Sequence, residues 1–231
     1  MEINYFKSLI YKLNHNQTRS LIHLRPLSET VDFAKVWEEK PKPTDKIASP
    51  GGPYKFYFIK NDQGTYVASI LDMWHDLHWF VLPGYRRKGH LTKALKETIL
   101  YHLFQEREEQ RITIDENAIG LKNFLASEKV ALRLGFKKVK ENNKPAYILK
   151  KNKYQTNNYF SGQNTLLTEA RFEELKKHIN FISNSLWLVQ TEIEMKLGEK
   201  DMSEELIELK DNISKQRWRL YDICFKLNKN K

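Results

Sequence analysis

The spacing of apolar residues divides the chain into two parts. Between residues 19 and 151, short apolar runs alternate with clusters of Gly, Pro, Asn and Asp, as they do in domains that mix strands and helices. From residue 165 to residue 231, apolar residues instead recur every three or four positions, which is the period of a helix. Residues 152–164 are polar and rich in Asn, and therefore predict a linker between the two parts.

The N-terminal segment predicts a helix, a strand and a second helix. Apolar residues at helical spacing over 3–13 indicate a short helix, so residues 1–18 are expected to form a helical extension of the mixed domain. Residues 21–27 are typical of a strand. Residues 28–30 (Ser-Glu-Thr) offer an N-cap, which predicts a helix over 31–37.

Three strands are predicted to follow and to lead into a basic turn. Residues 54–60 and 65–71 are aromatic and β-branched runs on either side of the Asn-Asp-Gln-Gly sequence at 61–64, which indicates a β-hairpin. Residues 74–82 continue as a third strand and complete an antiparallel meander. The loop of residues 41–53 ahead of the hairpin contains four prolines and two glycines, and we expect a mobile lid or a substrate-contacting segment there.

The remainder of the first part alternates between helical and strand patterns. In chain order it predicts an amphipathic helix at 91–103, a strand at 111–115, a helix at 119–134 that ends at Gly135, and a hairpin of 136–139 with 146–149. The whole part therefore predicts an α/β (α+β) fold, with a mixed, mostly antiparallel central sheet flanked by helices.

The C-terminal part predicts an antiparallel helical hairpin. Its apolar stripe consists of Phe172, Leu175, Ile179, Ile182, Leu186, Val189, Ile193 and Leu197, then Met202, Leu206, Leu209, Ile213, Leu220, Ile223 and Leu227. Gly198 can end the first helix, and Asp201 with Glu204 can cap the second.

Two helices cannot cover each other completely, and several aromatic residues lie off the stripe, namely Phe181, Trp187, Trp218 and Tyr221. We therefore expect residues 165–231 to pack on the first domain or on another subunit, as in a coiled-coil dimer or another homo-oligomer.

Composition restricts the class of protein. The 231 residues are 40% hydrophobic and 12% aromatic, which is enough for a sizeable core. Cys224 is the only cysteine, so the chain can form no intramolecular disulfide and no cysteine-based metal site, and a cytoplasmic setting is expected. The seven histidines show no metal-ligand spacing. No signal peptide and no membrane-spanning run is recognisable, so we expect no membrane association.

The net charge of +10 lies entirely in the first 160 residues. Residues 161–231 hold 12 basic and 12 acidic residues, which leaves 27 basic against 17 acidic in residues 1–160. Such an excess suits a polyanionic ligand, either a nucleotide cofactor or nucleic acid. A lysine-rich surface without a ligand has the same composition.

The chemistry of the chain is expected at the basic turn that follows the third strand of the meander. The strand ends at Pro83-Gly84, and Arg86, Arg87 and Lys88 precede a glycine and the amphipathic helix. Free N–H groups and the positive end of a helix bind anions, and Gly89 permits close approach of the backbone. The turn therefore predicts a phosphate site.

The turn resembles the phosphate-binding turn of the GNAT N-acetyltransferase superfamily. Arg86, Gly89 and Leu91 stand where the family has its Arg/Gln, Gly and Gly/Ala positions, with Val81 and Pro83 upstream. Residues 24–27 also resemble the family's opening strand. Residues 127–136 (SEKVALRLGF) resemble the end of the helix that follows its fifth strand. The resemblance covers about residues 19–151.

The resemblance implies that acetyl-coenzyme A is the co-substrate, without a metal. The backbone amides of residues 87–91 would hold its pyrophosphate together with Thr92, and the cationic side chains would assist. The backbone of Val81 and Leu82 would pair with the pantetheine arm where two strands of the sheet separate. The implied cofactor-binding residues are Val81, Leu82, Arg86, Arg87, Lys88, Gly89, His90, Leu91 and Thr92.

The resemblance implies His75 as the candidate catalytic base, because it lies six residues before the family's valine position. An imidazole is a common general base and could take a proton from an ammonium group, directly or through water. Asp76 and His78 are substitutes if a bulge changes the register. An alternative is that His75 is a surface or packing histidine.

The general acid is unassigned. The family often has a tyrosine four residues before the glycine of Leu-Gly-Phe, and Ala131 stands at that position. Phe124 stands where the family often has an asparagine, with Asn123 one residue away. The leaving thiolate would then be protonated by another group or by water.

Three functions remain open. The first is acetyl transfer to a primary amine of a small molecule by direct attack in a ternary complex. The second is the same reaction on a macromolecule, such as a protein or peptide amine or an aminoacyl-RNA, with the basic surface steering the partner. The third is a degenerate acyl-coenzyme A-binding or scaffold protein that uses its helical hairpin for protein interaction.

Overall fold

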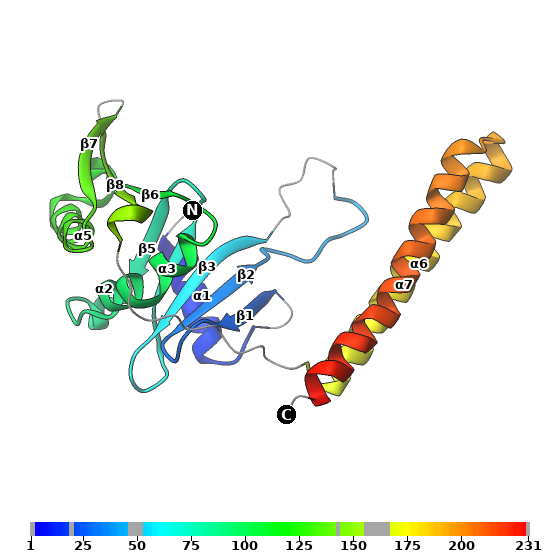
Figure 1. The fold of residues 1–231 in the computed structure, drawn as a ribbon, viewed down its shortest axis with the longest axis horizontal. Helices are drawn as coiled ribbons and strands as arrows, with labels where there is room; N and C mark the ends of the chain where they lie inside the picture. Colours follow the sequence, from blue (N-terminus) through cyan, green and yellow to red (C-terminus); the bar gives the residue numbers. More distant parts are fainter. Residues whose placement is uncertain (1–2, 19–20, 46–52, 142–143, 155–166, 230–231) are drawn as a thin grey trace. The chain divides into compact units, whose positions relative to one another are not determined.

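The computed structural model describes residues 3–18, 21–45, 53–141, 144–154 and 167–229. Parts of the predicted loop at 41–53 and most of the predicted linker at 152–164 lie outside these residues. The chain forms two compact units, Met1–Asn164 and Thr165–Lys231 (Figure 1).

The first unit is a mixed α+β structure that begins with helix α1 (Ile3–Asn14). Five antiparallel strands follow in sequence order and form one sheet. They are β1 (Ile22–Pro26), β2 (Val31–Val36), β3 (Tyr54–Lys60), β4 (Tyr66–Asp72) and β5 (Leu77–Val81). The predicted hairpin of β3 and β4 and the meander into β5 are confirmed.

The helix predicted over residues 31–37 is wrong, because this segment is strand β2. Residues 27–31 form a tight turn in which the N–H groups of Leu27 and Ser28 donate to the carbonyl of Val31, at 2.9 and 3.1 Å. The strand then pairs with β1 on one side and β3 on the other, and Val31 lies opposite Ile59. Pairing along two edges outweighs the weak local signal of an N-cap.

A second sheet follows the basic turn, so the predicted single central sheet is in fact two sheets. The connecting helix is continuous over residues 90–103 and π-helical in its middle, as α2 (His90–Ala94), η2 (Leu95–Ile99) and α3 (Leu100–Leu103). The remaining elements are β6 (Glu109–Thr113), α4 (Glu116–Ile119), α5 (Leu121–Arg133), β7 (Lys137–Glu141), β8 (Lys144–Lys150) and the short helix η3 (Lys151–Lys153). The three strands are ordered β6-β8-β7 and are antiparallel.

Both faces of the five-stranded sheet are covered by helices. On one face α1 packs against buried residues of the strands, including Phe56, Phe58 and Phe80. On the other face the helix of residues 90–103 and α5 pack against Tyr57, Ile70 and others. Successive strand residues point to opposite faces, so the runs of buried residues in β3 and β4 fill two cores.

The second unit is the predicted pair of antiparallel helices, α6 (Glu169–Leu197) and α7 (Asp201–Lys229) (Figure 1). Thr168 caps α6 by accepting from the N–H of Arg171, and Gly198 ends the helix with φ +60°. Asp201 is the first residue of α7, and Glu199 accepts from the N–H of Met202 at 2.7 Å. Among the described residues, no helix is long and apolar enough to cross a membrane.

Candidate functional site

The basic turn is tied to the end of β5 by hydrogen bonds. A single turn of 3₁₀-helix, η1 (Pro83–Tyr85), follows the strand, and the N–H of Tyr85 donates to the carbonyl of Leu82 at 2.9 Å. The guanidinium Nε of Arg86 donates to the carbonyl of Val81 at 3.1 Å. The turn is therefore anchored on the strand, and the terminal nitrogens of Arg86 extend beyond that anchor.

Two residues of the turn have left-handed backbone conformations. Arg87 has φ +62° and Gly89 has φ +84°, with Lys88 between them outside the left-handed region. A non-glycine residue rarely adopts such a φ, and successive residues of alternating hand orient their N–H groups into a concavity that suits an anion. A Cβ on Gly89 would meet no atom within 4 Å, so the glycine is required by its φ and not by close packing.

The concavity carries positive charge at the start of a helix. The side chains of Arg86, Arg87 and Lys88 are exposed, and the Lys88 ammonium lies 5.1 Å from the ring centre of Tyr85. Leu91 is buried in the core and fixes the first turn of α2. The N–H groups of this first turn have no intrahelical acceptors and face the same region as the cations.

Of the two strand residues expected to pair with a pantetheine arm, only Val81 directs its backbone groups to the open edge, and its carbonyl also accepts from Arg86. The N–H of Leu82 donates to the carbonyl of Val67 at 3.0 Å, and its own carbonyl accepts from Tyr85. Hydrogen bonding alternates along an antiparallel strand, so Trp79 and Val81 direct their backbone groups away from β4, to the open edge of β5. An extended ligand could pair with this edge.

The open edge of β5 lies where the two sheets separate. β5 is the last strand of the first sheet and β6 an edge strand of the second. Asp76 joins them, because its Oδ1 accepts from the N–H of Leu77 at 2.8 Å and from that of Thr113 at 2.9 Å. One carboxylate thus holds the start of β5 to the end of β6. Asp76, a substitute base in the sequence analysis, has a structural role.

His75 lies in the turn between β4 and β5, at the opposite end of β5 from the basic turn. Its side chain is exposed, and its N–H donates to the carbonyl of Met73 at 2.8 Å around Trp74, which has φ +67°. This is a γ-turn with positive φ, a strained geometry. The five residues of β5 span about 17 Å, so His75 and the basic turn are at opposite ends of one strand.

The strained turn is held by a buried ion pair. Arg107 donates to both carboxylate oxygens of Asp72, at 2.7 and 3.1 Å, and also to the carbonyl of Trp74 at 2.7 Å. The guanidinium lies 4.8 Å from the ring centre of Trp74. His75 therefore follows a rigid segment, and the structure fixes its backbone.

The three candidates for the base do not converge. His78 is exposed on β5 and shares the α1 face with Phe80, whereas Trp79 and Val81 face the helix of residues 90–103. Asp76 lies at the contact with β6, and His75 lies in the preceding turn. The side chains of His75 and His78 are exposed and that of Asp76 is partly buried, so the three groups lie in three different surroundings.

The structure brings Ser127 to the side chain of Trp79 on β5, a contact that sequence reasoning missed. Its hydroxyl accepts from the indole Nε1 of Trp79 at 3.3 Å, across from α5 to β5. Asn123, Ser127 and Ala131 are spaced by four residues on one face of α5. That spacing was the signal available in the sequence. Ala131 is fully buried in the core, so no tyrosine-like acid could extend from it without repacking.

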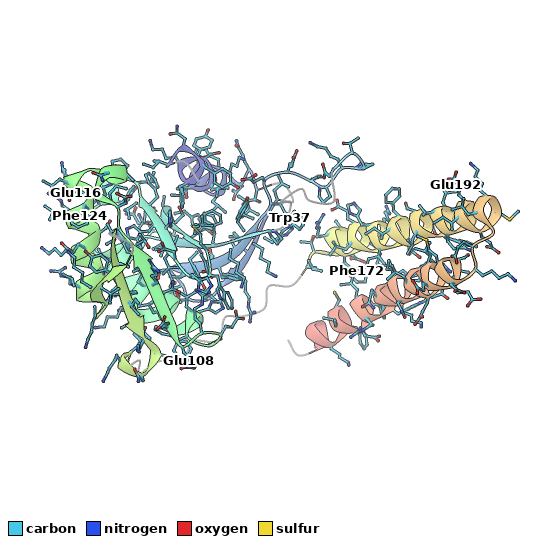
Figure 2. The ribbon with its side chains drawn as sticks, turned by 90° about the horizontal axis from the view of Figure 1, so that it is seen from above. Trp37, Glu108, Glu116, Phe124, Phe172 and Glu192 are labelled. Atoms are coloured by element: carbon cyan, nitrogen blue, oxygen red, sulfur yellow. The ribbon has the colours of Figure 1, made fainter. Side chains whose placement is uncertain are left out.

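Glu128, next to Ser127, is held in its ionised form. Its Oε1 accepts from Lys138 at 2.8 Å and from the Tyr147 hydroxyl at 2.6 Å. These hydrogen bonds lower the pKa of the Glu128 carboxyl. Glu128 therefore does not supply a proton near neutral pH. Phe124, labelled in Figure 2, is buried against the same core.

A partly buried Tyr–His pair lies at the far end of the connecting helix. The Tyr57 hydroxyl and His102 Nδ1 are 2.8 Å apart, and the His102 ring lies 5.1 Å from that of Phe33. Burial lowers the pKa of His102 and raises that of Tyr57, so both groups are neutral near pH 7. Twelve helical residues, about 18 Å, separate His102 from the basic turn. The pair is a satisfied part of the core.

Within the described parts of the chain, no group of three or more His, Cys, Asp or Glu side chains could hold a metal ion. Neither the family models nor the curated proteins with which the sequence was compared match it.

Proposed function

We propose that the first unit is a GNAT-type N-acetyltransferase that moves an acetyl group from acetyl-coenzyme A to a primary amine. The observation that carries the proposal is the anion-binding turn, in which left-handed Arg87 and Gly89 precede a helix at the end of an open strand edge. A ligand with a polyphosphate at one end and an extended amide arm at the other suits this combination.

The order of elements around the turn supports the proposal. An antiparallel sheet ends in β5, the basic turn and a helix follow, and β6, α5 and the β7–β8 hairpin complete the unit. The sheet opens between β5 and β6, as the resemblance implied for the strand that pairs with pantetheine. Strand β2 departs from the pattern, because the resemblance implied a helix at that place.

Each part of the site has a role in the proposed reaction. The turn binds the phosphates, and the edge at Trp79 and Val81 aligns the pantetheine arm. Acetyl-coenzyme A supplies an activated acyl group. The neutral amine attacks the thioester carbonyl, the carbon–sulfur bond breaks, and the thiolate takes a proton. We assign deprotonation of the ammonium to His75, directly or through water. Ser127 is the hydroxyl that the structure places beside Trp79 of β5.

A second candidate function is coenzyme A binding without efficient transfer, with residues 165–231 as a protein-interaction module. Three observations favour it. Ala131 is buried, Asp76 is committed to two backbone N–H groups, and Glu128 is held ionised. These weaken acid and base catalysis but leave the anion-binding turn unaffected.

Gly89 and Gly84 provide a matched test of the turn. Both have free space for a Cβ, but only Gly89 requires a left-handed φ. Gly89→Ala should therefore shift the turn away from its binding geometry, at a cost of about 1–3 kcal/mol, whereas Gly84→Ala should not. We expect acetyl-coenzyme A to raise the melting temperature of wild type and Gly84→Ala but not of Gly89→Ala.

Equal thermal shifts in the two variants, or none in wild type, would refute the site. Thiol release in the presence of small amines, peptides or RNA then separates the two functions. Release with one of these acceptors supports transfer and names the acceptor class. Binding without release above the background hydrolysis supports the second function.

A further inference from the structure

The contact between α6 and α7 is only half apolar. The positions turned toward the partner helix repeat every three and four residues, and alternate ones are polar. On α6 the polar members include Ser183 and Gln190, and on α7 they include Ser203, Lys210 and Arg217.

Buried hydrogen bonds fix the register of the pair. Ser183 Oγ lies 2.7 Å from Ser214 Oγ and donates to the carbonyl of Lys210 at 3.2 Å, while Gln190 Nε2 donates to Ser203 Oγ at 2.6 Å. The helices are therefore held by specific polar contacts. The apolar residues that do not face the partner helix form a second, exposed surface of the pair.

That second surface is an apolar face with one polar interruption, Gln216. It consists of Leu175, Ile182 and Val189 on α6 and of Met202, Leu209 and Ile223 on α7. Each of these residues comes immediately before a residue that is turned toward the partner helix. Two antiparallel helices are related by a two-fold axis that is perpendicular to the plane containing both. All six therefore lie on one side of the pair. Ile182 is 52% exposed and Leu209 51%, although both are large aliphatic residues.

The opposite side of the pair mixes polar residues with exposed aromatic rings. A groove of about 530 Å³ there is lined by Asn180, Ser183, Lys210, Ser214 and Arg217, with the rings of Trp187 and Trp218. The groove side therefore combines polar and aromatic residues, whereas the six members of the other face are all aliphatic or Met.

We infer that the apolar face binds a second copy of this chain and forms a four-helix bundle. Each helix has 29 residues and is about 43 Å long, and two helices side by side are about 20 Å wide. The face therefore offers about 800 Å² per partner, which is the standard size of a stable protein interface.

The face is self-complementary in spacing and charge. Its members recur every seven residues on α6, and on α7 the same repeat is interrupted once, by Gln216 between Leu209 and Ile223. The same face can meet itself about a two-fold axis and bring four apolar stripes together. Residues 165–231 hold 12 basic and 12 acidic residues, so no net charge selects an acidic or a basic partner. The bundle would complete the apolar core that the pair lacks.

The first unit lacks a matching surface among its described residues. Its main exposed apolar stripe is on α5, at Leu121, Leu125 and Leu132. That helix has 13 residues and is about 20 Å long, so it covers less than half of the apolar face.

Sedimentation velocity of the full chain tests the inference. We expect a species of twice the 27.5 kDa chain mass, and Val189→Glu with Leu209→Glu should weaken the association at least tenfold. Asn184→Glu with Thr191→Glu adds the same charge to exposed positions outside the apolar face and should leave the dimer unchanged. A monomeric wild type, or a dimer unaffected by the first variant, would overturn the inference.

Disulfide crosslinking keeps the inference testable if the charged variant does not fold. Ile182 lies next to the midpoint of α6 and thus near the proposed two-fold axis. In a Cys224→Ala chain, Ile182→Cys should crosslink two copies under mild oxidation, and Asn184→Cys should not. Failure of the first to crosslink, or equal crosslinking of both, would contradict the proposed face.

Discussion

The two units of the chain bury their apolar residues to very different degrees. In the first unit neighbouring strand residues that point in opposite directions are both covered, as Tyr57 at 1% and Phe58 at 0% exposure illustrate. In the second unit Phe181 and Leu188 are more than 70% exposed. A unit with two covered faces supplies its own core. A two-helix unit with a polar seam does not, so its stability should depend on what covers it.

The largest expected difference concerns two ion pairs of equal length. Asp72–Arg107 in the first unit and Glu192–Lys196 on α6 both have N–O distances of 2.7 Å, but the first pair is buried and the second is exposed. Glu192 is labelled in Figure 2. Asp72→Ala should destabilise the protein by about 3–5 kcal/mol, because it leaves a buried guanidinium unpaired. Glu192→Ala should change stability by less than about 1 kcal/mol. Urea denaturation of both variants checks this.

Similar losses of unfolding free energy in Asp72→Ala and Glu192→Ala would show that the burial of an ion pair does not decide its contribution to stability. Arg107→Met combined with Asp72→Ala provides the control. Removal of both charges should recover part of the loss, because no unpaired charge then stays buried.

A smaller effect is expected in the polar seam of the helical pair. Ser203→Ala removes one of the two acceptors of the Gln190 amide, the other being Glu194, and should cost about 1–2 kcal/mol. Ser203→Ala with Gln190→Leu replaces both partners by apolar groups and should cost less than the single change. Thermal unfolding followed by circular dichroism measures both. A double variant less stable than the single one would mean that the hydrogen bond is not the source of the loss.

The smallest expected effect is a pH dependence from His102. Burial lowers its pKa below the ordinary value of 6.5, so the unfolded chain takes up the proton at a higher pH than the folded chain does. The contribution to stability is therefore complete above that value and is lost as the pH falls below it. His102→Gln should reduce the loss of unfolding free energy between pH 7 and pH 5. His23→Gln on β1, where the side chain is exposed, should leave that loss unchanged.

Much of the first unit could be predicted because its signals are local. The turn at Asn61–Gly64 and the alternation around it indicate the β3–β4 hairpin from a few neighbouring residues. Strand β2 could not be predicted in this way, since residues 31–36 are strand only because β1 and β3 pair with them. The contact that joins the two sheets likewise links distant residues, Asp76 and Thr113, which are 37 residues apart.

The candidate site shows the same division between local and distant signals. The basic turn and its glycine are contiguous in sequence and could be identified there. Ser127 could not be identified, because its contact with Trp79 joins segments 48 residues apart. The N–H of Leu82 is hydrogen-bonded to β4 and its carbonyl to η1. This pairing follows from strand register, which the sequence does not show. In the helical pair, the predicted stripe combined inward residues such as Leu186 with exposed ones such as Val189, because both lie within one helical period.

The central claim is that the turn from Arg86 to Thr92 binds the phosphates of coenzyme A. Titration calorimetry with coenzyme A on Gly89→Ala and Gly84→Ala tests it most directly, because the two variants differ in the required backbone φ and not in available space. We predict wild-type affinity for Gly84→Ala and an affinity at least tenfold lower for Gly89→Ala. Equal affinities for the two variants, or no binding heat for wild type, would contradict the claim.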